Sequence, residues 1–142
     1  MQRLSFDEVI EQILAKDKRY ARDAYEFVRE ALDYTQKKLF KHKPRETPHV
    51  TGQELLEGIR EFALQRFGPL TLLVFDEWGI HSTEDFGEIV FNMVDAGLLA
   101  KTEKDSRADF ANGYDFDEAF RQPFLPSSKK SSKTPPPNSV RA

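Results

Sequence analysis

The segment GPLTLLVFDEWGIHSTEDFGEIVFNMVDAGLLA, residues 68–100, predicts two helices joined by a tight turn. Residues 70–78 have the length of a short helix, which Gly79 ends. Ser82 or Thr83 can cap the helix that follows. Apolar side chains then recur at three- and four-residue intervals, as on the buried face of a helix, and they are Phe86, Ile89, Val90, Met93 and Val94. This arrangement is typical of a helix-turn-helix.

Three further helices are predicted on the N-terminal side of this segment. Ser5 and Thr51 each precede a glutamate by three residues, which is the spacing of a capping box at the start of a helix. Asp17 is the candidate cap of a longer helix that lies between these two. Gly68 and Pro69 end the helix that starts after Thr51, because glycine accepts the left-handed C-terminal conformation and proline cannot continue the helix.

Beyond the fifth helix the pattern changes from helical spacing to that of strands. Residues 98–102 predict one strand, and the alternation of aromatic and acidic residues over 114–117 predicts a second. Asn112-Gly113 is a strong turn signal, so a tight hairpin of 107–111 against 114–118 is a second option. Either hairpin would form the wing that follows a helix-turn-helix.

The predicted fold is therefore mainly α with a small β-hairpin, a winged-helix-like domain preceded by an N-terminal helical hairpin. The helical hairpin covers residues 1–45 and the winged-helix-like domain covers 46–122. Residues 123–142 form a tail rich in Pro, Ser and Lys. Such a composition cannot bury enough apolar surface to offset the entropy lost on ordering, so the tail is predicted to be disordered.

Two resemblances accompany these patterns. The order of elements over residues 51–120 resembles that of winged-helix domains. The passages VTGQELL at 50–56, TEDFGEIVF at 83–91 and YDFD at 114–117 are similar to a family of short, uncharacterised bacterial proteins. This second resemblance covers most of residues 1–120, and it implies no activity.

Composition and termini exclude several classes of protein. The chain has 142 residues and no cysteine, which removes disulfides, thiolate zinc sites and cysteine nucleophiles. No apolar run reaches the length of a membrane helix. The first residues lack the apolar stretch of a signal peptide, so we expect a cytoplasmic protein with no membrane contact.

Charge is distributed unevenly along the chain. Residues 1–45 hold 11 basic and 8 acidic side chains, whereas residues 46–122 hold 6 basic and 16 acidic ones. The tail adds three lysines and one arginine with no acid. Segregated charge influences which partners a protein binds. An alternative interpretation is that the basic ends neutralise the acidic middle, within one chain or between chains.

The fifth helix presents an acidic face opposite its apolar stripe. At 100° per residue this face consists of Glu84, Glu88, Phe91, Asn92 and Asp95. Carboxylates repel DNA phosphates, so reading of the major groove is not favoured. An aromatic side chain within a charged rim instead predicts a protein-binding surface. We expect a non-enzymatic interaction module that binds a basic protein partner, or a second copy, through this face. In the alternative, Phe91 is covered by one of the first two helices or by Phe120 and Phe124.

A second hypothesis concerns the basic segment 37–45. Its cations could contact phosphates in a nucleic-acid-associated transcriptional regulator. They are Lys37, Lys38, Lys41, Lys43 and Arg45. Nucleic acid is thus a possible partner that the sequence does not favour, because such a run is more often a solvated helix end.

Signals for catalysis are weak. His42 and His49 lie in a proline-marked linker at a separation that matches no helical ligand pair, and His81 lies in the turn before the fifth helix. No phosphate loop or dinucleotide fingerprint is present. The sequence predicts no catalytic residue, no metal site and no cofactor.

Overall fold

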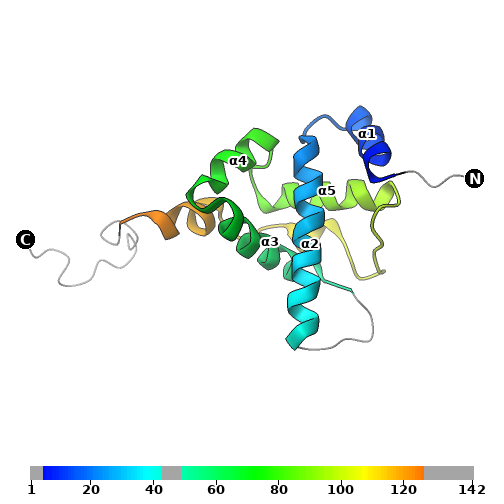
Figure 1. Ribbon diagram of the computed structural model, residues 1–142. Coiled ribbons are helices and arrows are strands. Elements are labelled where there is room, and N and C mark those ends of the chain that lie inside the picture. Colours follow the sequence, from blue (N-terminus) through cyan, green and yellow to red (C-terminus); the bar gives the residue numbers. More distant parts are fainter. Residues whose placement is uncertain (1–4, 43–48, 127–142) are drawn as a thin grey trace, which may run out of the picture.

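The computed structural model describes residues 5–42 and 49–126, which form a helical assembly (Figure 1). The five longer helices are α1 (Phe6–Lys16), α2 (Arg22–His42), α3 (Gly52–Phe67), α4 (Thr71–Trp78) and α5 (Thr83–Asp95). Four short helical turns accompany them: η1 (Gly68–Leu70), η2 (Arg107–Phe110), η3 (Asp117–Arg121) and η4 (Gln122–Phe124). Helix α2 lies across both α3 and α5 (Figure 1).

Local capping signals place most helix ends where the sequence predicts them. The Thr51 hydroxyl accepts a hydrogen bond from the Glu54 N–H, and the Glu54 carboxylate accepts one from the Thr51 N–H, which completes the predicted capping box. Gly79 ends α4 with φ of 85° in the left-handed region. Asp17 is an exception, because it is the C-cap of α1 rather than the N-cap of α2, which starts at Arg22.

The predicted β-hairpin is wrong, and with it the winged-helix-like assignment. Residues 98–126, all within the described part of the chain, form no strand. Ser106 and Asp109 instead form a capping box that starts η2. The Thr83 hydroxyl donates to the Phe110 carbonyl at 2.6 Å and accepts from the Gly113 N–H at 3.0 Å. The Phe110 carbonyl is one of the backbone groups that the tight hairpin of 107–111 against 114–118 would have needed for its ladder.

The C-terminal segment folds onto the core through its aromatic residues. Phe116 and Phe120 pack against Phe75 of α4, with ring centroids 5.8 and 5.3 Å away. In place of the predicted second strand, residues 114 and 115 have no regular structure and Phe116 leads into η3. Asn112 adopts a positive φ of 52°, which confirms a turn at Asn112-Gly113 without a hairpin. Pro123, the first residue of the predicted tail, belongs to η4, whereas residues 127–142 lie outside the described part.

The core is formed where α2, α3, α4 and α5 meet. Phe27 of α2 lies with its ring centroid 5.5 to 5.6 Å from the rings of Phe62, Phe67, Phe75 and Trp78. Burial of so much aromatic surface is the main stabilising contribution in a chain of this size. Helix α1 adds Val9, Ile10 and Ile13, all buried, to the same core.

Candidate functional site

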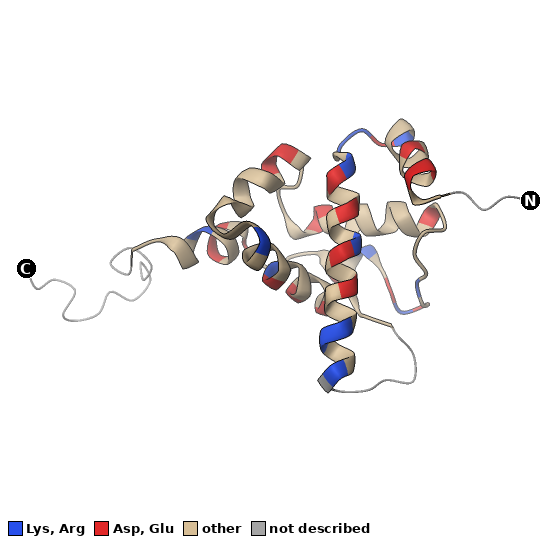
Figure 2. Ribbon diagram, viewed as in Figure 1, with Lys and Arg blue, Asp and Glu red and all other residues tan. Residues whose placement is uncertain are grey.

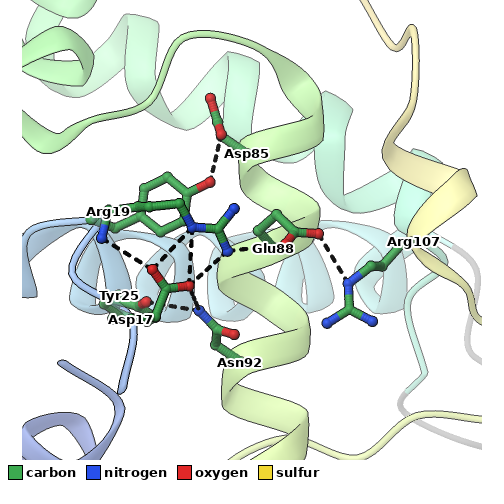
Figure 3. Close-up of polar contacts among 8 residues, drawn as sticks. Asp17, Arg19, Tyr25, Asp85, Glu88, Asn92 and Arg107 are labelled. Carbon is green, nitrogen blue, oxygen red and sulfur yellow. Dashed lines mark hydrogen bonds and ion pairs between the residues drawn. The ribbon is translucent and has the colours of Figure 1, made fainter. Parts of the chain in front are cut away.

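Ion pairs connect the α1–α2 connection and the start of η2 to the surface of α5 (Figure 3). Arg19 Nη2 donates to Asp17 Oδ2 at 2.6 Å and to Glu88 Oε1 at 3.0 Å. Arg107 Nε donates to the other oxygen of Glu88, Oε2, at 2.9 Å. Glu88 of α5 therefore lies between two guanidinium groups that come from opposite sides of the helix.

Asn92, one turn further along α5, joins the same network (Figure 3). Its amide Nδ2 donates to Asp17 Oδ2 at 3.0 Å and to the Tyr25 hydroxyl at 3.1 Å. The Arg19 guanidinium, with a smaller contribution from Asn92, holds the pKa of the Asp17 carboxyl well below its usual range despite partial burial. Asp17 therefore stays ionised at neutral pH and fixes the end of α1 to α5.

Tyr20 and Asp85 fix the N-terminal end of α5. The Tyr20 hydroxyl donates to Asp85 Oδ1 at 2.5 Å, and Asp85 Oδ2 accepts from the backbone N–H groups of His81 and Ser82. Burial, reinforced by the Asp85 carboxylate, raises the pKa of Tyr20 well above its usual range. Asp85 thus completes the cap of α5 and connects it to Tyr20 in the α1–α2 connection.

The structure divides the five residues of the predicted acidic face into two groups. Phe91 is only 6% exposed, and the Arg107 guanidinium lies 4.9 Å from its ring centroid, so it is not an exposed anchor. Phe91 is thus buried, as the alternative expected, but the group over its ring is Arg107 of η2, which that alternative did not name. Glu88 and Asn92 are engaged in the network described above. Glu84 and Asp95 are exposed, and Glu84 accepts a hydrogen bond from the Asn112 N–H at 3.1 Å.

The predicted basic segment is only partly described. Lys37 pairs with Asp33 one turn earlier in α2, at 3.2 Å, and Lys38 pairs with Glu61 of α3. Lys41 is exposed at the end of α2. Two of the five cations of this hypothesis, Lys43 and Arg45, lie outside the described residues. The two paired lysines neutralise acids of the protein's own surface.

An apolar groove of about 350 Å³ lies between α2, the start of α3, the second half of α5 and the segment 98–110. Phe91 and Phe110, both buried, line it from the core side. Partly buried aliphatic side chains complete its apolar lining, and they are Leu32, Val50, Val90, Val94, Leu98 and Leu99. A groove of this size is at the lower end of the range of known ligand sites, about 300–1,000 Å³.

Polar side chains also line this groove. His49 Nε2 lies 3.0 Å from Asp105 Oδ2, which connects the segment before α3 to the loop before η2. Burial disfavours the ionised Asp105, but hydrogen bonds from the Thr102 N–H and from His49 outweigh it and lower the pKa of this carboxyl. Asp109 and Lys101 also line the groove. The arrangement offers an apolar surface beside two carboxylates and one lysine.

Sequence reasoning did not identify this groove. Its walls come from four segments far apart in the chain, and residues 98–102 were assigned to a strand. The pairing of His49 with Asp105 spans 56 residues and leaves no local pattern. The one signal was Leu98-Leu99 directly after a C-terminal glycine, because an apolar pair at that place must pack against the helix it follows.

The other candidates for chemistry are dispersed. Among the described residues no group of three or more His, Asp or Glu side chains could hold a metal ion. His81 is exposed, with Nδ1 at 3.4 Å from Asp76 Oδ1, and Ser82 beside it serves as the cap of α5. His42 lies at the end of α2, and its side chain is outside the described part.

The chain was compared with protein-family models, curated proteins and solved structures. No protein-family model, no curated protein and no solved structure matches the chain. In the part of the chain that the structure describes, none of the helices combines the length and the apolar character needed to cross a membrane.

Proposed function

We propose that this protein is a non-enzymatic interaction module that binds a basic segment of a partner protein. The observation that supports this proposal is the excess of acidic side chains in residues 46–122, 16 against 6 basic ones, with Glu84 and Asp95 exposed on α5. Figure 2 shows acidic side chains (red) on each of the five longer helices, whereas the lysines of α2 lie in its last, C-terminal turns. A basic partner would therefore meet attraction over most of this surface.

Glu84 and Asp95 are the carboxylates of α5 that remain exposed for such a partner. Glu88 lies on the same helix but is occupied by Arg19 and Arg107. Asp95 is exposed, has no ion pair within the described part of the chain, and lines a separate hollow between α5 and the end of α1. Hydrogen bonds from the Asn112 and Glu84 N–H groups lower the pKa of Glu84, so it carries its charge at neutral pH.

The test is capture of partners from a lysate of the source cells by the immobilised full-length protein, followed by mass spectrometry. The variant carries Glu84→Gln and Asp95→Lys, and its matched control carries Glu26→Gln and Asp23→Lys on α2. We expect the captured protein to be basic, to elute with rising salt, and to be lost from the variant but not from the control. Equal capture by variant and control, or capture of acidic proteins, would contradict the proposal.

A further inference from the structure

Within residues 5–42 and 49–126, the apolar surface of the groove remains partly open. Phe91 and Phe110 at its inner side are 6% and 3% exposed, so the protein core supplies a rigid base. Val90, Leu98 and Leu99 along its sides are packed against this core yet remain partly exposed, and Val94 beside them is also partly exposed. Apolar side chains gathered in a concave site of this kind mark places where apolar groups of a partner are buried.

The helices that border the groove favour a helix as its occupant. Val90 and Val94 are four residues apart on α5, so they present one apolar row along that helix. An amphipathic helix places its own apolar side chains three and four residues apart, and such a row fits into a groove bordered by helices.

The charged side chains that line the groove favour a basic helix over an acidic one. Asp105 and Asp109 line the groove, whereas Lys101 is the one lysine among the described lining residues. His49 and the Thr102 N–H keep Asp105 in its ionised form. An occupant with basic side chains beside its apolar row gains attraction here, and an acidic one meets repulsion.

We propose that the groove binds the apolar face of a basic amphipathic helix of the partner protein. This inference rests on the proposed function, because the helix belongs to the same basic partner, and it adds how that partner is anchored. The acidic surface attracts the partner, and the groove buries its apolar side chains. A few side chains buried at the centre of an interface usually carry most of the affinity.

The test uses three synthetic peptides of about 18 residues, a length that permits a helix on binding. One places Leu on one helical face and Lys on the other, the second replaces each Lys by Glu, and the third replaces each Leu by Ser. Fluorescence anisotropy measures their binding to the full-length protein. The Leu–Lys peptide is expected to bind at least about tenfold more tightly than either of the others. Equal binding of the Leu–Glu peptide would overturn the charge argument, and equal binding of the Ser–Lys peptide would overturn the groove.

Variants of the protein locate the binding. Val94→Gln makes the wall of the groove polar, and Ala100→Trp places a large ring at an exposed lining position without removing any core side chain. The matched control is Leu73→Gln, because Leu73 of α4 is 61% exposed and does not line the groove. We expect both groove variants to weaken binding of the Leu–Lys peptide by about tenfold or more and the control to leave it within about twofold. Loss of binding in the control alone would overturn the inference in favour of the surface at Leu73.

A measurement on the unmodified protein guards against misfolded variants. The Leu–Lys peptide is expected to shift the methyl NMR signals of Val90, Val94, Leu98 and Leu99. Shifts confined to other methyl groups would overturn the inference. A concentration-dependent dimer that Ala100→Trp dissolves would also overturn it, because a second copy would then fill the groove.

The same variants separate this inference from the proposed function. If Val94→Gln captures the basic partner as well as the unmodified protein does, while the Glu84 and Asp95 double variant loses it, the groove inference fails and the function stands. If no basic partner is captured by the unmodified protein, the function fails, whatever the peptides do. Loss of capture in both variants supports both.

Discussion

Gly58 of α3 lies where α2 crosses it, and Thr35 of α2 leaves no space for a larger residue. A Cβ atom added at Gly58 would be 1.7 Å from Thr35 Oγ1. This hydroxyl cannot turn aside freely, because it is buried and donates to the Ala31 carbonyl at 2.7 Å. The glycine thus sets the distance between the two helices that form one wall of the groove.

Gly58→Ala is therefore expected to lower the free energy of unfolding, although alanine favours a helix by about 1 kcal/mol over glycine. Overpacking at such a contact typically costs about 1–3 kcal/mol, and it outweighs the gain in helix propensity. Urea denaturation followed by circular dichroism measures the change. The control is Gly58→Ala made in the Thr35→Ala background. There Gly58→Ala should lower the free energy of unfolding by less than it does in the unmodified protein, because the clashing Thr35 side chain is gone. A single Gly58→Ala variant as stable as the unmodified protein would show that the helices move apart without cost.

For the acidic face of α5, the sequence predicted which residues share one side of the helix but not which distant residues contact them. The spacing of α5 correctly separates its apolar stripe from Glu84, Glu88, Asn92 and Asp95. It does not show that Arg19 and Arg107, from distant segments, both bind Glu88. Nor does it show that Arg107 also covers Phe91. Contacts between residues 69 and 19 positions apart have no local signature in a single sequence. The burial of Phe91 could be stated only as an alternative for this reason.

Among the elements, segment 107–113 depends on Thr83 for its position. The Thr83 hydroxyl is buried and serves both the Phe110 carbonyl and the Gly113 N–H. Thr83→Val preserves the shape of the side chain and leaves both backbone groups without this partner. Buried groups left unsatisfied cost about 1–3 kcal/mol, so we expect a stability loss of about 2 kcal/mol.

Hydrogen exchange distinguishes local release of this segment from a general loss of stability. In Thr83→Val the amide of Gly113 should exchange faster than the amides of α3, which lie in the core. Thr83→Ser keeps the hydroxyl and is the matched control, with protection of Gly113 retained. Exchange at Gly113 that is equal in both variants would mean that other contacts hold the segment, such as the burial of Phe110 against α5.

The helices were predictable and the segment after them was not, for a physical reason. Capping boxes and C-terminal glycines are local, so Thr51, Gly68 and Gly79 mark helix ends in the sequence itself. Alternating Tyr114 and Phe116 suit a half-buried strand and an irregular turn over a core equally well. What decides between them is a partner strand. The Ser106–Asp109 capping box turns the candidate partner 107–111 into η2, and residues 98–102 form no strand either.

At the scale of the whole molecule, the carboxylates predict how stability depends on pH. Hydrogen bonds and nearby cations lower the pKa values of Asp17, Glu61, Glu84, Asp105 and Asp117 in the folded protein. In the unfolded chain these groups take up protons near pH 4. The unfolded state therefore binds more protons in acid, and the stabilisation present above pH 4 is lost as the pH falls through the folded values.

Asp17 makes the largest expected contribution to this dependence, because Arg19 and Asn92 both donate to it and its side chain is only 17% exposed. Asp17→Asn should cost about 1–2 kcal/mol at pH 7, as expected for hydrogen bonds to a charged group. The difference in free energy of unfolding between the variant and the unmodified protein should shrink steadily below pH 4. There Asp17 is protonated in the unfolded chain but still ionised in the folded protein, so folding must release a proton and the unmodified protein loses stability, whereas the asparagine side chain of the variant does not titrate. Urea melts at pH 7, 4 and 2.5 measure it, with Asp23→Asn at an exposed position of α2 as the control. A constant difference across this range would mean that Asp17 acts through packing or neutral hydrogen bonds, and that the connection between α1 and α5 is not held by charge.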